Sequence, residues 1–350
     1  MSQIDLVLKG GTVVTPDGML QADVEIAGGR IVGLSAGELA VPARDAIDVS
    51  GLILLPGLID THTHLRQPGQ EHKEDIEHGT RAAAAGGYTT VIGMPNVDPV
   101  TSTVERLRDA LALYERASVV DYNHYPSGAV VEEIPALAAA GAIGFKVFMI
   151  SDGGRDHVRQ PGMGVHDDGQ LFQVAEAIAE TRLPMLVHPH NPALLKVFEA
   201  RFHARGERDA QAYAKAYAAC EGIIWDTPAS LLVRIQAATG VKLHLLHMKT
   251  RRMIKIVRDA KAAGQQITTE VNPVCMLLAN DWANIVRLGP YALSTYIGDD
   301  ESGPLWEAFL DGTIDVIGTD HAPHARAEKE IGWTDMWKAP GGLPHLQETL

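Results

Sequence analysis

LILLPGLIDTHTHLRQPG, residues 52–69, is the stretch that decides the fold and points to the chemistry. Its apolar run leads into Asp60, and two histidines then alternate at His62 and His64. Because residues two apart in a strand project from one face, both imidazoles are expected to point the same way. Neutral imidazole is the commonest nitrogen ligand of zinc-like ions. A lone His-x-His pair also arises often by chance, so the rest of the chain must decide between a metal site and a coincidence.

The composition favours a cytoplasmic protein without nucleic-acid or membrane contacts. The chain has 350 residues, enough for one large barrel or two ordinary domains. Its 30 basic and 44 acidic residues give a formal charge of −14, whereas nucleic-acid binding normally requires a basic patch. Cys220 and Cys275 are the only cysteines, too few for a disulfide framework. The sequence shows no secretory signal and no run of eighteen apolar residues.

The hydrophobic pattern predicts an α/β fold in two parts. Residues 1–50 alternate apolar and polar positions around turns at 16–18 and 28–29, which predicts a small, sandwich-like N-terminal β-domain. Residues 51–350 alternate short apolar strands with helical segments, and eight such strands favour a closed (β/α)8 TIM-type barrel. The expected strands are 52–61, 89–94, 118–124, 143–149, 184–188, 242–247, 267–271 and 314–319. The expected helices are 74–86, 101–117, 132–140, 168–182, 226–239 and 251–263, and the helical stretch 191–222 fits a lid or a subunit contact.

Residues able to bind metal recur where the expected strands end, which is where a barrel of this kind forms its active site. Histidines scattered at random would not produce this recurrence, so we expect a single site. The residues at these strand ends are His62 and His64, with Arg66, after the first strand, Asn96 after the second, Lys146 in the fourth, His188 at the fifth, His247 at the sixth, and Asp320, His321 and His324 at the eighth. Groups able to bind metal thus stand at five of the eight ends.

Lys146 lies in GAIGFKVFM, an apolar strand in which a charged ammonium would be expensive to bury. Either it reaches solvent or a carboxylate, or its neutral amine adds carbon dioxide and becomes a carbamate whose two oxygens bridge two cations. Two divalent ions sharing a hydroxide would supply a nucleophile and polarise a carbonyl. In that arrangement His62 and His64 hold one ion, His188 and His247 hold the other, the Lys146 carbamate bridges them, and Asp320 completes the first site.

Asp320 is the expected catalytic residue. Its carboxylate can take a proton from the attacking hydroxide and pass it to the leaving nitrogen, although a helix N-cap is its ordinary role. His321 fits an orienting neighbour of the metal ligands. Arg66 suits a substrate carboxylate because guanidinium makes paired hydrogen bonds. Asn96 and His324 could add substrate contacts, and loop or capping roles remain open for all three.

These motifs resemble the cyclic amidohydrolases, namely dihydroorotase, dihydropyrimidinase or hydantoinase, and allantoinase. The similar blocks are DTHTHLRQPG and MPNVDP near the start, FKVFM at 145–149, TDHAPHARAEK at 319–329 and APGGLP at 339–344. The resemblance implies a metal-binding set of His62, His64, carboxylated Lys146, His188, His247 and Asp320, with Asp320 catalytic and Arg66, Asn96 and His324 holding a substrate carboxylate. It also implies two divalent metal ions, with zinc expected, and a carbamate derived from carbon dioxide.

Four departures from the family pattern alter the expected wall around the substrate. His190 stands where relatives carry glutamate, and Val274 and Cys275 stand where histidines are usual. The segment LGPYALSTYIGDD replaces the usual NPPLR, and His345 stands where glycine is expected. Amide hydrolysis is therefore a firmer expectation than the identity of the ring. Chains of this family usually continue with strands that complete the small β-domain, so this domain is expected to be either incomplete or minimal here.

The expected function is metal-dependent ring opening of a dihydroorotate-like, dihydropyrimidine, hydantoin or imide substrate by a hydroxide bridging two metals. HLRQPG, MPN and DHAPH are closer to dihydroorotase, whereas FKVFM looks more like hydantoinase. Two alternatives are an exocyclic amidase or deaminase on the same barrel, and a catalytically silent dihydroorotase-like subunit. A homo-oligomer is expected because closed symmetric oligomers are common among soluble enzymes.

Overall fold

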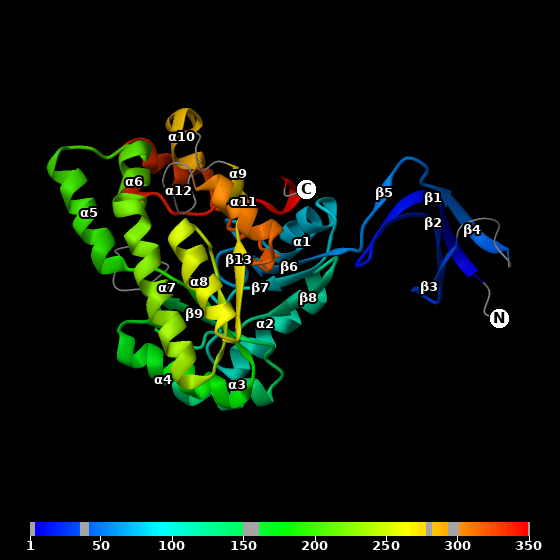
Figure 1. The fold of residues 1–350 in the computed structure, drawn as a ribbon, viewed down its shortest axis with the longest axis horizontal. Helices are drawn as coiled ribbons and strands as arrows, with labels where there is room; N and C mark the ends of the chain where they lie inside the picture. Colours follow the sequence, from blue (N-terminus) through cyan, green and yellow to red (C-terminus); the bar gives the residue numbers. More distant parts are fainter. Residues whose placement is uncertain (1–3, 36–41, 150–160, 278–281, 293–300, 349–350) are drawn as a thin grey trace. The chain divides into compact units, whose positions relative to one another are not determined.

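The computed structural model, drawn in Figure 1, describes residues 4–35, 42–149, 161–277, 282–292 and 301–348. The chain divides into two compact units, Met1–Leu58 and Ile59–Leu350. The first is a β-sheet unit and the second is an α/β unit. None of the helices in the described ranges combines the length and the apolarity that a membrane crossing demands.

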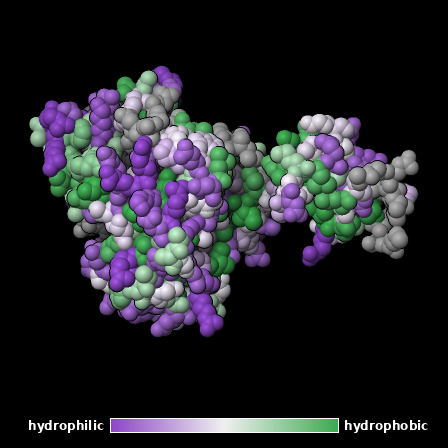
Figure 2. All heavy atoms as spheres, viewed as in Figure 1, coloured by the Kyte–Doolittle hydropathy of each residue, from purple (hydrophilic) through white to green (hydrophobic). Residues whose placement is uncertain are grey.

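The first unit is built on a mixed five-stranded sheet. β2 pairs antiparallel with β1 and β3, whereas β4 and β5 run parallel to β1. Gly28 and Gly29 have φ values of 57° and 71° in the tight β2–β3 turn, and glycine reaches this left-handed region without strain. Figure 2 shows hydrophobic residues on the visible surface of this unit. The strands are β1 (Ile4–Thr15), β2 (Gly18–Ala27), β3 (Arg30–Ser35), β4 (Ala43–Asp48) and β5 (Ile53–Leu54).

The second unit contains a strand in each of the eight ranges expected from the sequence, and the TIM-type barrel prediction is confirmed. The expected strand 52–61 is divided, because Pro56 and Gly57 interrupt it; β5 joins the first unit and β6 begins the barrel. A two-residue strand, β10, was not predicted. The strands are β6 (Leu58–Thr63), β7 (Tyr88–Gly93), β8 (Asp121–His124), β9 (Phe145–Met149), β10 (Gly164–Val165), β11 (Pro184–His188), β12 (Lys242–Leu245), β13 (Ile267–Val271) and β14 (Val316–Ile317).

Two parallel bridges join the strands of this unit into a ring. One sheet has the order β10-β9-β11-β12-β13-β14 and the other has the order β6-β7-β8. Ser127, just after β8, bridges to Lys146 on β9, and Thr63 on β6 bridges to His321, just after β14. The second seam therefore lies beside the histidines of the opening motif and the DHAPH segment.

Helices cover the outside of the ring, with α4 against β11, α7 against β12 and α8 against β13 (Figure 1). The stretch 191–222 is largely helical, as expected, and α6 buries Tyr213 and Tyr217 against the rest of the unit. The helices are α1 (Ile76–Ala85), α2 (Val104–Ala117), α3 (Ile134–Ala139), α4 (Asp168–Thr181), α5 (Pro192–Ala204), α6 (Ala210–Tyr217), α7 (Ala219–Thr239), α8 (Arg251–Ala262), α9 (Pro273–Leu277), α10 (Trp282–Leu288), α11 (Ser302–Leu310) and α12 (Arg326–Glu330). Short 3-10 helices span Val131–Glu133, Gly289–Tyr291, Ile331–Trp333, Met336–Lys338 and Leu346–Glu348.

Alternation along β9 places Lys146 on the side opposite the main core. Phe145 and Val147 belong to the large apolar cluster that the strands share with the outer helices. Successive side chains of a strand point to opposite faces, so Lys146 faces the interior of the ring. Its backbone partner Leu186 belongs to a second cluster that includes Ile92 and Leu246. The barrel thus presents a buried lysine to its own interior.

Candidate active site

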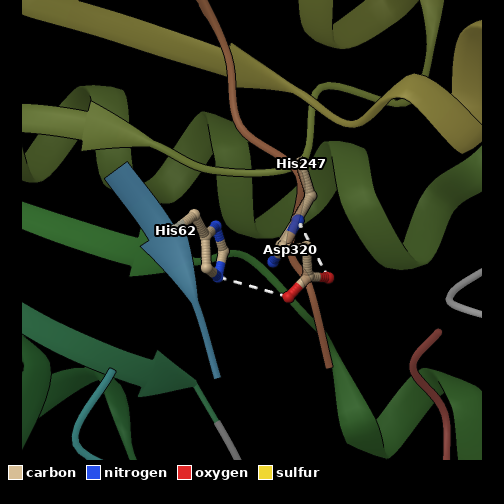
Figure 3. Close-up of side chains that lie close together, drawn as sticks. All are labelled: His62, His247 and Asp320. Carbon is tan, nitrogen blue, oxygen red and sulfur yellow. Dashed lines mark ion pairs between the residues drawn. The ribbon is translucent and has the colours of Figure 1, made fainter. Parts of the chain in front are cut away.

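His62, His247 and Asp320 meet at the C-terminal ends of the barrel strands (Figure 3). One potential ligand atom from each lies within 4.8 Å of the others. His62 Nε2 is 3.3 Å from Asp320 Oδ1, and His247 Nδ1 is 3.9 Å from Asp320 Oδ2. The two histidines are buried, whereas the Asp320 side chain is 15% exposed. Three elements far apart in the sequence thus supply one compact donor set.

The other three expected metal ligands adjoin this group. Lys146 Nζ is 3.3 Å from His62 Nε2, and His64 Nε2 is 3.0 Å from Asp320 Oδ1. His188 ends β11, and its ring centroid is 4.6 Å from that of His247. The structure therefore brings all six residues into one cluster.

Each of three site histidines has its Nδ1 atom bonded to a side-chain oxygen. His62 Nδ1 donates to Glu270 Oε1 at 2.7 Å. His64 Nδ1 donates to Asn96 Oδ1 at 2.5 Å, and His247 Nδ1 donates to Asn272 Oδ1 at 2.7 Å. A neutral imidazole with its proton on Nδ1 carries a lone pair on Nε2. These oxygens therefore fix the tautomer that a metal ligand needs.

The donor set fits a divalent cation. Burial lowers the pKa of His62 well below its usual value, and burial also lowers the pKa of His64, so both rings are neutral. Their Nε2 lone pairs then face the Asp320 carboxylate, which can only accept hydrogen bonds. Acceptors that face one another at about 3 Å repel unless a cation or a proton lies between them. Histidine nitrogen and carboxylate oxygen are both ordinary zinc ligands.

Lys146 is fully buried within this cluster. Burial lowers its pKa to about 8, while the nearby carboxylates of Asp320 and Glu270 act in the opposite direction. Its Nζ also lies 4.6 Å from the centroid of the Phe148 ring. A lysine pKa near neutrality increases the fraction of neutral amine, which is the form that reacts with carbon dioxide.

His247 and Asp320 hold unusual backbone conformations, with φ values of 58° and 55°. Few residues other than glycine adopt this left-handed region, although Asp and His are among those that enter it most readily. Such conformations cluster at functional sites, where the surrounding structure imposes them. Both residues follow the last residues of their strands, and these turns carry their side chains into the cluster.

Arg66 and His324, expected to bind substrate, lie against each other at one side of the cluster. An Arg66 terminal nitrogen is 3.2 Å from His324 Nε2, and Arg66 Nε donates to the carbonyl of Pro323 at 3.1 Å. Burial lowers the pKa of Arg66 to about 10. Asn96 is the third residue expected to bind substrate. Its side-chain oxygen contacts His64, which is a histidine of the site.

His321 points away from the cluster and joins three segments. Its Nε2 lies 2.9 Å from Glu74 Oε2, and its Nδ1 accepts from the His345 backbone N–H at 3.0 Å. Its carbonyl accepts from the His64 N–H at 2.7 Å. This histidine therefore supports the backbone that carries His64 and Asp320.

Three carboxylates around the site were not predicted from the sequence; Asp60 and Glu270 are buried and Glu74 is half-buried. Asp60 accepts from Thr319 Oγ1 at 2.5 Å and from the His62 N–H, and burial raises its pKa to about 7. Burial likewise raises the pKa of Glu270 to about 7, and Glu74 contacts His321. Asp60 lies two residues before His62, in the same alternation as His62 and His64. This spacing could have indicated that Asp60 lies on the same face of the strand. For Glu270 the sequence offers a weaker indication of a role in the site, which is that this acidic residue lies in an otherwise uncharged strand.

Two of the departures from the family pattern have clear contacts. Cys275 accepts from Lys249 Nζ at 2.9 Å, and both side chains are buried. The His190 ring lies 5.9 Å from the ring of His188 and is stacked on Tyr217. Within LGPYALSTYIGDD, the segment that stands in place of NPPLR, residues 293–300 lie outside the described residues.

Comparison with known proteins assigns the family. The Amidohydrolase family profile matches residues 53–339. An L-hydantoinase of Paenarthrobacter aurescens is 29% identical over 353 residues, covering 99% of this chain and 74% of that protein. A dihydroorotase of Staphylococcus epidermidis is 32% identical over 349 residues, covering 96% of this chain and 76% of that protein. The solved L-hydantoinase (dihydropyrimidinase) from Arthrobacter aurescens has a TM-score of 0.90 at 28% identity, covering 99% of this chain and 76% of that chain. The chain therefore belongs to the amidohydrolase family, within the cyclic amidohydrolases that include dihydroorotases, hydantoinases and dihydropyrimidinases.

Proposed function

We propose that this protein opens the ring of a cyclic amide by hydrolysis at a binuclear metal centre held by His62, His64, Lys146, His188, His247 and Asp320. As a cyclic amidohydrolase, it is a hydrolase of carbon–nitrogen bonds in cyclic amides. The observation that carries the proposal is the convergence of His62, His247 and Asp320 ligand atoms within 4.8 Å, beside Lys146. Two bound divalent cations would supply Lewis acidity, which polarises a carbonyl and acidifies water.

Asp320 is proposed as the group that moves the proton. Its side chain retains 15% exposure while the imidazoles of His62 and His64 beside it are buried, so its carboxylate can reach a substrate. A carboxylate at this position can accept a proton from the attacking water and deliver it to the ring nitrogen as the C–N bond breaks. Burial lowers the pKa of His62 and of His64, so each of these imidazoles is a weaker proton acceptor than a free histidine.

Lys146 is proposed as a carboxylated lysine. Its amine would add carbon dioxide to form a carbamate and release one proton, and the resulting anion would face His62 in a buried interior. An uncompensated buried anion is costly, so the carbamate would be stable only together with cations. Growth with ¹³C-bicarbonate followed by ¹³C NMR should show a carbamate signal in wild type and none in Lys146→Ala.

The decisive experiment uses purified protein supplied with zinc and bicarbonate. Dihydroorotate, dihydrouracil, hydantoin, allantoin and simple cyclic imides are offered in turn, and ring opening is followed by ultraviolet absorbance. We expect at least one ring to be opened, with loss of activity in Asp320→Asn and in Lys146→Ala. A metal-loaded protein that opens none of these rings would contradict the proposal.

A further inference from the structure

Lys249 and Cys275 form a buried pair next to segments that carry the proposed metal site. Lys249 follows β12, two residues after the proposed ligand His247, and Cys275 lies in α9, three residues after Asn272. Asn272 accepts the His247 Nδ1–H, so each member of the pair follows closely, along the chain, on one partner of that contact. Neither Lys249 nor Cys275 is among the six proposed metal ligands.

The two reactive atoms of this pair are close together. Lys249 Nζ is 2.9 Å from Cys275 Sγ. This is an ordinary length for a hydrogen bond from nitrogen to oxygen, and sulfur is the larger atom, so the contact is short for a hydrogen bond to sulfur. One oxygen atom bonded to both Nζ and Sγ would therefore span the gap with little movement of either side chain.

The surroundings favour a reaction between these two atoms over other reactions of the thiol. Lys249 has no exposed surface and Cys275 is 3% exposed, so burial keeps bulky reagents and other proteins' thiols away. The face of Trp225 lies beside the lysine, with its ring centroid 5.3 Å from Nζ. Dioxygen is small and uncharged, and it enters such an interior at far lower cost than a charged oxidant. The lysine nitrogen is then the nucleophile in contact with the sulfur.

We propose that Lys249 and Cys275 form a reversible covalent cross-link, an Nζ–O–Sγ bridge, when dioxygen oxidises them. One oxygen atom enters the bridge and forms one S–O and one N–O bond, while the other leaves as water with two hydrogens of the pair. Sulfur and nitrogen each give up two electrons, and these four electrons reduce dioxygen. The balance is the same for a thiol with an amine and for a thiolate with an ammonium. Two molecules of a dithiol reductant return four electrons and four protons, which restores both side chains and releases the bridging oxygen as water.

The bridge would tie the end of β12 to α9. It closes a loop of 27 residues, counted from 249 to 275 inclusive. A covalent link across such a loop restricts the unfolded chain more than the folded one. We therefore expect the Tm of the cross-linked protein to be about 5 °C higher than that of the reduced protein.

The test compares zinc-loaded protein kept without oxygen with the same protein held in air-saturated buffer. Both samples are first reduced with dithiothreitol, which is then removed under nitrogen. After denaturation, free thiols are alkylated, the protein is digested with trypsin and the peptides are measured by mass spectrometry. Cys275→Ser and Lys249→Gln each remove one partner of the bridge, and Cys220→Ser is the matched control at the exposed cysteine.

We expect air to join the peptides that contain Lys249 and Cys275, with the summed mass of the two plus one oxygen atom and minus two hydrogen atoms. Wild type and Cys220→Ser should show this product together with the rise in Tm. Cys275→Ser and Lys249→Gln should show neither, and dithiothreitol should return the wild-type peptides to their separate masses.

Three results on wild type would overturn the inference. Cys275 could stay reduced in air, or it could become a sulfenic or sulfinic acid beside an unmodified Lys249. The two peptides could also be joined without the extra oxygen atom. All three are read from peptide masses of wild type, whether or not the variants fold, and none depends on whether the protein opens a cyclic amide.

Discussion

His62 illustrates how a buried carboxylate sets the chemistry of a neighbouring imidazole. Glu270 accepts its Nδ1–H, and both side chains have no exposed surface. The proton held there directs the Nε2 lone pair towards Asp320 and Lys146. Gly318 makes room for this contact, because a Cβ at that position would overlap the Glu270 carboxylate. Glu270 is therefore a positioning residue for a proposed metal ligand.

Replacing Glu270 with glutamine should weaken zinc binding by about 10- to 100-fold. The amide keeps the shape of the side chain but loses the charge that holds the proton on His62 Nδ1. Zinc content and competition with a chromophoric chelator measure the effect, and Glu115→Gln on the exposed face of α2 is the control. Equal zinc affinity in Glu270→Gln and wild type would show that the carboxylate does not orient His62.

Single residues also mark the limit of what the sequence predicts. The sequence could predict that one cluster contains six residues, each at or just beyond an apolar strand: His62, His64, Lys146, His188, His247 and Asp320. Glu270 could not be paired with His62, since 208 residues separate them and their contact depends on strand register. Glu74 and His321 are likewise 247 residues apart.

At the scale of elements, the α1 C-terminus shows how closely the last described segment packs on the barrel. A Cβ at Gly86 would overlap the carbonyl oxygen of Leu346, in the 3-10 helix Leu346–Glu348. Gly303, in α11, has open space around the same position. The two glycines therefore provide a matched pair, in which only one is required by packing.

Gly86→Ala should lower the free energy of unfolding by about 1–3 kcal/mol, since backbone must move to relieve the overlap. Gly303→Ala should leave it unchanged or raise it by up to about 1 kcal/mol, because alanine favours a helix. Urea unfolding followed by circular dichroism measures both values. Equal stabilities for the two variants would mean that Leu346 does not pack on α1 in solution.

The contact between α7 and α8 predicts a pH dependence. Asp226 accepts from Thr250 Oγ1 at 2.5 Å, and burial raises its pKa to about 6, although this hydrogen bond and Arg252 oppose the shift. Between about pH 4 and about pH 6 the folded protein then holds a proton that the unfolded chain has released. This residue therefore lowers stability as the pH rises through that window.

Asp226→Asn should remove this contribution, so the stability of the variant relative to wild type should increase as the pH rises from about 4 to about 6. Urea midpoints of both proteins at the two pH values measure the difference. If the gap between variant and wild type stays constant with pH, Asp226 does not titrate in this window.

Elements were predicted well where the hydrophobic period was undisturbed. The strands at 184–188 and 267–271 coincide with β11 and β13. The strand expected at 52–61 was divided, because an apolar run does not reveal which of two sheets each half joins. β10 has only two residues, too few to show any period.

At the scale of the whole molecule, the proposed metal site lies across the seam that closes the barrel. His62 is on β6, and Asp320 follows β14, whose neighbour His321 bridges to Thr63 across the same seam. His247 belongs to a third part of the ring, just after β12. A cation bound by these residues would link segments up to 258 positions apart (320 minus 62), and it would bind the folded chain far better than the unfolded one.

Removing metal should therefore destabilise the whole barrel. At a free zinc concentration about a hundred times the Kd, the linked stabilisation is about 2.7 kcal/mol, which corresponds to a fall in Tm of about 5 °C on adding a chelator. Differential scanning calorimetry with zinc, with chelator and with zinc restored measures the shift. His247→Asn should lose most of it, whereas His72→Asn, at an exposed histidine outside the cluster, should keep it. A Tm that does not respond to chelator, in protein shown to have contained zinc, would place the bound zinc elsewhere than across this seam.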